Sequence, residues 1–137
     1  MDFARTGIIL FTKHYDACVS FYTETLGLPV LFIADELGLK LTCCNFGGAY
    51  LMIETDGPPP AVEKSPEQNP TKLRFNVTDV EAAAKELERK GVGVRRAKYD
   101  WGTVADFVDP DGNLCQLRDE ASFLSVRPRT LRFGWIG

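Results

Sequence analysis

The feature that most constrains the fold of this 137-residue chain is an order of predicted elements that occurs twice: a strand, a helix and then three strands. Both helices are amphipathic, with apolar residues on one face at helical spacing. Each is followed by a glycine that can end it, Gly27 in the first half and Gly91 in the second, 64 residues apart. Sequence identity between the halves is weak, so the repeat is one of pattern. We therefore predict an α+β fold built from two tandem βαβββ modules.

The first module is predicted at residues 7–56 and the second at residues 71–118. Their helices are predicted at residues 15–26 and 80–90, and Asp79 is the expected N-cap of the second helix. The sequence Asp109-Pro110-Asp111-Gly112 is a strong turn signal. The predicted strands cover residues 8–12, 29–35, 39–45, 49–54, 73–77, 93–98, 103–108 and 113–118.

Two segments lie outside the modules. Residues 57–70 contain five prolines and are predicted to form an exposed, extended linker. Residues 119–137 form a C-terminal extension with apolar residues such as Phe123, Phe133, Trp135 and Ile136. We expect this extension to pack either on the sheet or on a second subunit.

Composition narrows the class of protein. With 45% hydrophobic and 26% charged residues, the chain can bury a core as a soluble globule. Its net charge of -3, without a clustered basic face, argues against nucleic acid as a partner. Its longest apolar run, residues 30–34, is far too short to span a membrane. Four cysteines without a C-x-x-C spacing favour reduced thiols and a cytoplasmic location.

Two motifs carry a family resemblance. The first is Phe21-Tyr22 followed by Leu26-Gly27-Leu28, and the second is Trp101-Gly102 followed by Phe107 and the Asp109 turn. In this order and spacing the chain resembles the vicinal oxygen chelate superfamily, which includes glyoxalase I, bleomycin-resistance proteins and extradiol dioxygenases. The resemblance covers about residues 7–118. It implies that both modules form a half-open, barrel-like mixed sheet with helices outside, around a cavity, and that the protein is a homodimer.

The resemblance also implies four metal-ligand positions, which fall on Gly7, Glu54, Lys72 and Gln116. Only Glu54 is a usual ligand, because Gly7 has no side chain, Lys72 is cationic and Gln116 is a weak neutral donor. The only histidine, His14, precedes the first helix and is expected at the surface. We therefore expect no metal and no other cofactor. The alternative is a divalent metal held by Glu54 and Gln116.

Strand alternation extends the predicted lining of the cavity from those four positions. Lys72 is expected to place its ammonium where the family places its cation, paired with Glu54, and this pair is either part of the ligand site or merely structural. The predicted ligand-binding residues are Phe11, Tyr50, Met52, Glu54, Lys72, Arg74, Trp101, Phe107 and Gln116.

Three functions remain in view. The first is a metal-independent protein that binds a polar or anionic, possibly aromatic, small molecule in the cavity of its sheet. The second is a metal-dependent lyase, isomerase or dioxygenase with an atypical site built on Glu54. The third is a protein that assembles with a partner through its apolar C-terminal extension. The sequence leaves open whether the chain is an enzyme, since three of the four expected ligand positions do not match.

Overall fold

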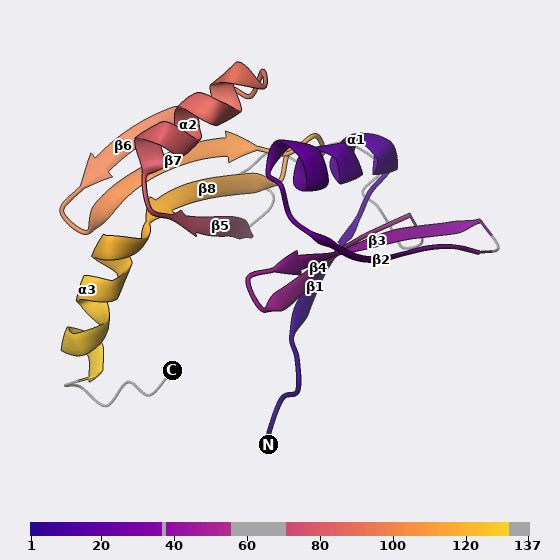
Figure 1. Cartoon of the computed structure of the whole chain (residues 1–137), viewed down its shortest axis with the longest axis horizontal. Helices are drawn as coiled ribbons and strands as arrows, with labels where there is room; N and C mark the ends of the chain where they lie inside the picture. Colours follow the sequence, from indigo (N-terminus) through magenta and orange to yellow (C-terminus); the bar gives the residue numbers. More distant parts are fainter. Residues whose placement is uncertain (37, 56–70, 132–137) are drawn as a thin grey trace. The chain divides into compact units, whose positions relative to one another are not determined.

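The computed structural model describes residues 1–36, 38–55 and 71–131, with side chains as far as residue 125 (Figure 1). The predicted linker at residues 57–70 and the apolar residues Phe133, Trp135 and Ile136 lie outside the described residues. The described residues form two compact units. The first holds the N-terminal module and the turn Asp109–Gly112, and the second holds the remainder of the C-terminal module and the helix after it.

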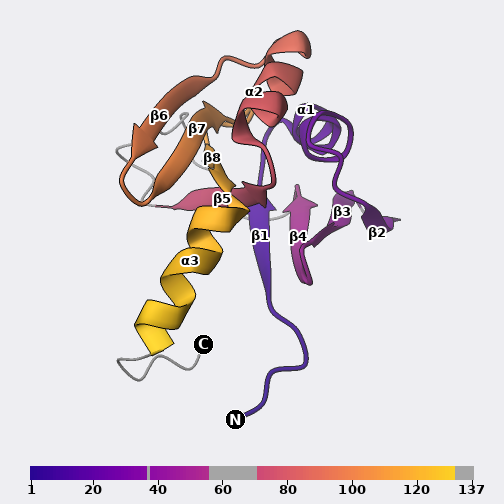
Figure 2. The same cartoon turned by 60° about the vertical axis from the view of Figure 1, so that its left-hand side comes forward.

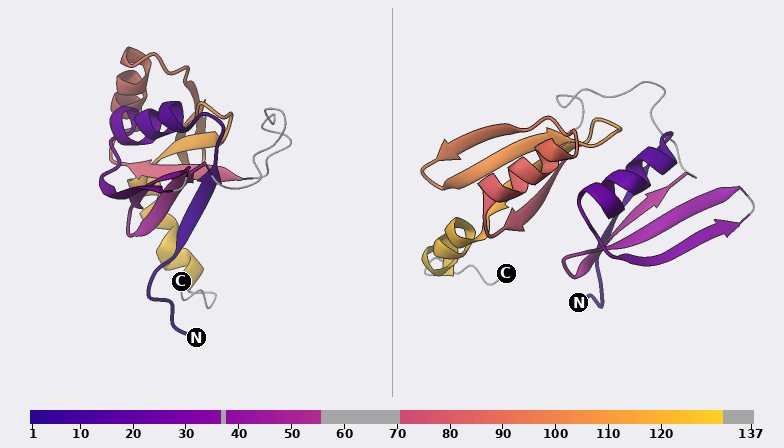
Figure 3. Two further views of the ribbon diagram at one scale, coloured as in Figure 1. Left: turned by 90° about the vertical axis from the view of Figure 1, so that its right-hand side faces the viewer. Right: turned by 45° about the horizontal axis from the view of Figure 1, so that its top comes forward.

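The first unit is a four-stranded sheet with one helical segment. Its strands are β1 (Gly7–Phe11), β2 (Val30–Glu36), β3 (Leu39–Phe46) and β4 (Ala49–Glu54), in the sheet order β1-β4-β3-β2. The first and last strands, β1 and β4, pair in parallel, and the other pairs are antiparallel. The helix α1 (Tyr15–Ser20) connects β1 to β2 and lies along one face of the sheet (Figures 2 and 3).

The second unit repeats this topology. Its strands are β5 (Lys72–Val77), β6 (Arg95–Tyr99), β7 (Gly102–Val108) and β8 (Leu114–Asp119), in the order β5-β8-β7-β6, with β5 and β8 parallel. The helix α2 (Val80–Arg89) packs on β7 and β8. The prediction of an α+β fold with two βαβββ modules is therefore confirmed. No helix among the described residues is long and apolar enough to cross a membrane.

The two module helices end as their sequences indicate. The first continues from α1 into a π-helical turn, η1 (Phe21–Thr25), in which the Leu26 N–H donates to the Phe21 carbonyl at 2.9 Å. The wider turn keeps Phe21 and Tyr22 buried, and Gly27 then leaves the helix at φ 76°. In the second helix, Asp79 is the N-cap and accepts a hydrogen bond from the Ala82 N–H at 3.0 Å.

A third helix, α3 (Glu120–Leu131), occupies the start of the C-terminal extension, where no helix was predicted. Asp119 holds its first turn, because one carboxylate oxygen accepts from the Ser122 N–H at 2.8 Å while the other accepts from the Thr103 N–H of β7 at 2.8 Å. The Thr103 bond, followed by those from Ser122, holds the pKa of Asp119 below its usual value. One carboxylate therefore anchors α3 to β7.

The first unit is held together by buried polar contacts as well as by apolar packing. The Tyr22 hydroxyl donates to Asp109 at 2.7 Å, and both side chains are buried. The Cys18 thiol donates to Asp111 at 3.3 Å. The predicted turn is present, since the Gly112 N–H donates to the Asp109 carbonyl at 3.0 Å and Gly112 has φ 83°. Helix residues far away in sequence thus fix the Asp109–Gly112 turn.

We predict that Tyr22→Phe lowers the free energy of unfolding by about 1–3 kcal/mol, because it removes the hydrogen bond that the buried Asp109 side chain accepts from the Tyr22 hydroxyl. Urea titration of the wild-type and variant proteins measures the difference. Tyr15→Phe is the control, since Tyr15 is only half-buried and its hydroxyl bonds to the neutral hydroxyl of Thr42. An equal loss in both variants would show that the Asp109 contact contributes nothing beyond an ordinary hydroxyl bond.

The Cys18 thiol predicts an alkaline loss of stability. Burial, partly opposed by the hydrogen bond with Thr12, raises its pKa to about 12. The folded-state pKa lies above that of the unfolded chain, so the thiol stays protonated in the fold while the unfolded chain releases its proton from pH 9.0 upward. This contribution to stability is complete below pH 9.0 and is lost toward pH 12.

The expected slope from this group is about 1.4 kcal/mol of unfolding free energy for each pH unit in that window. Cys18→Ser keeps a donor toward Asp111 but does not titrate there, so its stability should fall less steeply with pH. Denaturant titrations at several alkaline pH values measure both slopes. Identical slopes in the wild type and in Cys18→Ser would show that the Cys18 thiol does not cause the alkaline loss of stability.

Candidate functional site

The second sheet has one face under α2 and one face away from it. Arg96 on β6 forms ion pairs with two acids of α2, at 2.7 Å to Glu81 and 2.6 Å to Glu88, so its side chain faces the helix. Because side chains alternate along a strand, its neighbour Arg95 faces away. The register carries this second face across the sheet from Arg95 to Asp106 on β7, then to Gln116 on β8 and Arg74 on β5.

A line of hydrogen bonds joins three of these side chains. The Arg74 Nε–H donates to Gln116 Oε1 at 2.8 Å, and the Gln116 Nε2–H donates to Asp106 Oδ1 at 2.8 Å. Gln116 is 3% exposed, and both ends of its amide are engaged. Its amide is oriented by this network, with the oxygen toward the guanidinium and the nitrogen toward the carboxylate. Only the Nε of Arg74 takes part in these hydrogen bonds, and its two terminal nitrogens do not.

An aromatic cluster lies against this line. Tyr99 and Trp101 stack with ring centroids 5.0 Å apart, and they are 52% and 42% exposed. The Arg118 guanidinium lies 4.9 Å from the Trp101 ring centroid and 5.4 Å from that of Phe123 on α3. Arg74 lies 5.8 Å from the Trp101 ring. Rings and guanidinium groups at these distances attract one another through cation–π contacts.

Arg118 is an unusual buried cation. It is 7% exposed, one of its terminal nitrogens donates to the Trp101 carbonyl at 3.1 Å, and its Nε is buried without a hydrogen-bond partner in the part of the chain that the structure describes. Within the same residues, no carboxylate forms an ion pair with Arg118, Arg74 or Lys72. Among the described residues, Lys72, Arg74, Arg95 and Arg118 therefore share this face with one strand acid, Asp106, and with Glu120 of α3, which accepts a hydrogen bond from Asn76 at 3.1 Å.

The first sheet also has an open face, and it is apolar. Leu51 and Ile53 of β4 are fully buried beside α1, so the residues between them face away from the helix. The parallel register sets Gly7 beside Tyr50, Ile9 beside Met52 and Phe11 beside Glu54. Ile9 and Phe11 are exposed, which gives this face apolar surface with one carboxylate at its end.

Gly7 lies under an aromatic ring. A Cβ added at this position would stand 2.2 Å from Cε2 of Tyr50, closer than any two unbonded carbons can approach. The Tyr50 ring therefore fills the space in which any side chain at position 7 would begin. Any other residue at position 7 would require the Tyr50 ring to move from its place over β1.

The predicted site residues fall into two groups, one in each unit. Phe11, Tyr50, Met52 and Glu54 share the open face of the first sheet. Lys72, Arg74 and Gln116 share the open face of the second, with Trp101 against Arg74. The predicted pair of Glu54 with Lys72 joins residues of different units and stays a prediction.

Phe107 is placed differently from the other predicted ligand-binding residues. It is 3% exposed, pairs with Cys115 and stacks on Phe75 with centroids 6.4 Å apart, on the α2 side of the sheet. Its side chain belongs to the core, because it lies one position out of phase with Asp106. We leave Phe107 out of the proposed site for this reason.

Sequence reasoning missed Arg118 and Asp106, which the structure brings into the site. Both were within reach of strand alternation: Arg118 lies two positions after Gln116 on the same strand, and Asp106 lies opposite Gln116 in the register. The alternation that extended the predicted lining along the other strands was not carried past Gln116 on β8 or across to β7.

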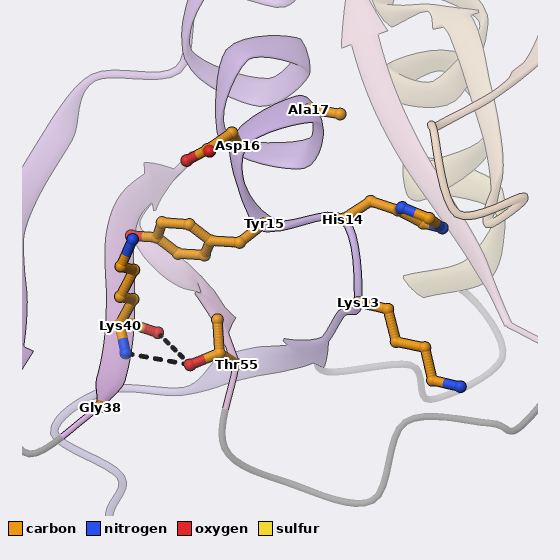
Figure 4. Close-up of a pocket in the computed structure, with 8 residues that line it drawn as sticks. All are labelled: Lys13, His14, Tyr15, Asp16, Ala17, Gly38, Lys40 and Thr55. Carbon is orange, nitrogen blue, oxygen red and sulfur yellow. Dashed lines mark hydrogen bonds between the residues drawn. The ribbon is translucent and has the colours of Figure 1, made fainter.

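A separate pocket of about 430 Å³ lies beside the start of α1 in the first unit (Figure 4). The Thr55 hydroxyl accepts from the Lys40 N–H at 3.0 Å at one side of it, and the Tyr15 ring forms another wall. No predicted ligand-binding residue lines this pocket, and its side chains carry both signs of charge. The lining residues are Lys13, His14, Tyr15, Asp16, Ala17, Gly38, Lys40 and Thr55.

The positions at which the family resemblance implies metal ligands do not fit a divalent cation. A ligand side chain at position 7 is blocked by the Tyr50 ring, and the Gln116 oxygen already accepts from a guanidinium. Lys72 brings a positive charge. Among residues 1–36, 38–55 and 71–125, no three His, Cys, Asp or Glu side chains gather as a metal site would need.

The fold defines a class of protein with two βαβββ modules, each of which has a four-stranded sheet with one face away from its helix. The model of the Glyoxalase/Bleomycin resistance protein/Dioxygenase superfamily matches residues 4–117. The chain belongs to this superfamily, as its motifs indicated.

Known relatives agree with this membership. The uncharacterized protein YraH of Bacillus subtilis (strain 168) is 29% identical over 119 residues, which cover 80% of this chain and 93% of YraH. The crystal structure of SMU.1112c superposes with a TM-score of 0.73 at 26% identity, covering 84% of this chain and 97% of the other. TnmS3, an antibiotic binding protein from Streptomyces sp. CB03234, has a TM-score of 0.65 at 24% identity, with 87% and 98% covered. A lactoylglutathione lyase from Agrobacterium tumefaciens has the same TM-score at 17% identity, with 86% and 94% covered.

We predict that Gly7→Ala lowers the free energy of unfolding by about 1–3 kcal/mol, because its Cβ forces the Tyr50 ring to move in a packed sheet. Thermal or urea unfolding measures the change. Gly93→Ala is the matched control and should be near neutral, since a Cβ there meets no atom within 4 Å. Truncating the ring in a Gly7→Ala/Tyr50→Ala protein should remove most of the extra cost relative to Tyr50→Ala alone. An equal cost of Gly7→Ala with and without the ring would contradict the steric explanation.

Proposed function

We propose that this protein is a metal-independent binder of small molecules, which holds a polar or anionic ligand with an aromatic part on the open faces of its sheets. The observation that carries the proposal is the chemistry at the family's metal positions. One position is filled by the Tyr50 ring over Gly7, and another holds an amide that is already bonded at both ends, to Arg74 and Asp106.

The two faces offer what such binding needs. Ile9, Phe11 and Met52 supply apolar surface on the first module. Arg74 and the half-exposed Trp101 supply charge and a ring for stacking on the second. Apolar surface, rings for stacking and a few polar groups are the usual components of a ligand site, and each face carries some of them.

A structural neighbour supports the binding of small molecules as one use of this fold. TnmS3 is described as an antibiotic binding protein, and its fold matches this chain over most of both lengths. Binding requires shape, stacking and hydrogen bonds, all of which the described side chains can supply. Lewis-acid chemistry would require a ligand set that positions 7, 72 and 116 lack.

The proposal includes a homodimer located in the cytoplasm. Support for a dimer comes from β2, an edge strand of the first sheet, in which Val30, Leu31, Phe32 and Ile33 are all exposed. A continuous apolar run on an edge strand is a surface that proteins normally cover. Sedimentation of the wild-type protein and of a Phe32→Glu/Ile33→Lys variant measures the oligomeric state, and a wild-type monomer would remove this part of the proposal.

The first experiment measures metal content per subunit after incubation with zinc, nickel, manganese and ferrous iron, followed by desalting. We expect no stoichiometric retention, because three of the four family positions lack a usual ligand for a divalent cation. Glu54→Ala should therefore retain the same trace of metal as the wild type and as the control Glu36→Ala, an exposed acid of the same module. Stoichiometric retention that Glu54→Ala alone abolishes would overturn the proposal in favour of a metal-dependent enzyme.

A further inference from the structure

We infer that the open face of the second module selects planar aromatic acids, with the acid group on Arg74 and Lys72 and the ring against Tyr99 and Trp101. This inference rests on the proposed function and narrows it to one chemical class of ligand. It also assigns the selection to one module.

The first support is the state of Arg74. Its Nε is engaged by Gln116, and Gln116 is in turn held by Asp106, so the guanidinium is fixed in place. Its two terminal nitrogens carry no hydrogen bond from the described residues. A planar guanidinium that is held at one nitrogen and open at the others presents a fixed pair of donors with the geometry of a carboxylate. Preorganisation of this kind reduces the entropy lost when a ligand binds.

The second support is the uncompensated charge behind Arg74. The buried Arg118 has no carboxylate partner among the described residues, and only the rings of Trp101 and Phe123 and one carbonyl stabilise its charge. Burying a cation without an anion is costly. Lys72 lies two positions before Arg74 on the same face of β5 and adds another positive charge. A bound anion would offset this local excess, because the two acids described at this face, Asp106 and Glu120, are fewer than its four cationic side chains.

The third support is the aromatic surface next to these donors. Trp101 lies 5.8 Å from the Arg74 guanidinium and stacks on Tyr99, and about half of each ring is exposed. Exposed, preordered rings beside a cation favour a ligand that joins a flat apolar part to an acid group. A free inorganic anion would use the charges but leave the rings in water.

The test uses calorimetric titration of the full-length protein with three probes: 2-naphthoate, its neutral counterpart 2-naphthamide, and inorganic phosphate. We expect 2-naphthoate to bind at least about tenfold more tightly than 2-naphthamide, because charge-assisted hydrogen bonds to Arg74 form only with the acid. Phosphate should bind more weakly than 2-naphthoate, because it gains nothing from the rings. High salt should weaken the binding of 2-naphthoate and leave the affinity for 2-naphthamide almost unchanged.

Three variants test which side chain causes the preference for the acid over the amide. Arg74→Met should lower the affinity for 2-naphthoate by about tenfold or more and should leave the affinity for 2-naphthamide unchanged. The variant should therefore lose the preference for the acid. Arg89→Met, at the exposed end of α2, removes the same charge from the same module and should keep the preference. Lys72→Met should reduce the preference in the same direction. Circular dichroism confirms that each variant is folded, which is expected because all three side chains are exposed.

Equal affinity of the wild type for the acid and the amide, or binding of neither, would overturn the inference. Phosphate that binds as tightly as 2-naphthoate would show a site for any anion, and it would contradict the proposed contact of the ligand ring with Tyr99 and Trp101. A preference that survives Arg74→Met but disappears in Arg89→Met would place the site elsewhere. These outcomes are separate from a failure of the proposed function, which shows as retained metal whether or not the acid is preferred.

Discussion

The parallel pairing of the first and last strands of each module is the constraint on which the rest of the structure depends. It sets β1 beside β4 and β5 beside β8, although a helix and two further strands lie between the paired strands in sequence, and the helix covers one face of the sheet. Two strands distant in the module thereby present their alternate side chains as neighbours on the opposite face. A slip of one residue would turn every one of these side chains to the helix side, so burial of the helix side fixes the register.

The same parallel pairing carries very different side chains in the two modules. In the first module the pair is Gly7 with Tyr50, and a ring covers the glycine. In the second the pair is Arg74 with Gln116, and a guanidinium bonds to an amide. The backbone arrangement is the same in both, and only the side chains decide whether the paired position is apolar or charged. A repeated scaffold can therefore carry an apolar face on one module and a cationic face on the other.

The module order, helix stops, turn at Asp109 and N-cap at Asp79 were predictable because each depends on local chemistry: a glycine that accepts positive φ, a proline, or a short acidic side chain. The reason for Gly7 was not predictable, since it lies in the rotamer of Tyr50, 43 residues away. Phe107 was assigned to the ligand set because a motif marked it, although its phase along β7 places it in the core. The helix α3 was missed because its sequence contains Pro128, and its first turn depends on Asp119, which also bonds to β7.

The exchange of a metal for a guanidinium has a consequence for what the protein can do under our proposal. A divalent cation both holds the oxygens of a ligand and draws electron density from them, and the second effect drives chemistry. A guanidinium holds carboxylate oxygens by hydrogen bonds and charge, but it offers no empty coordination position and polarises bound oxygens far less. Under our proposal, Arg74, fixed by Gln116 and Asp106, would therefore recognise a ligand by charge and hydrogen bonds and would supply no Lewis acid. A superfamily scaffold altered in this way favours retention of an intact ligand over its conversion.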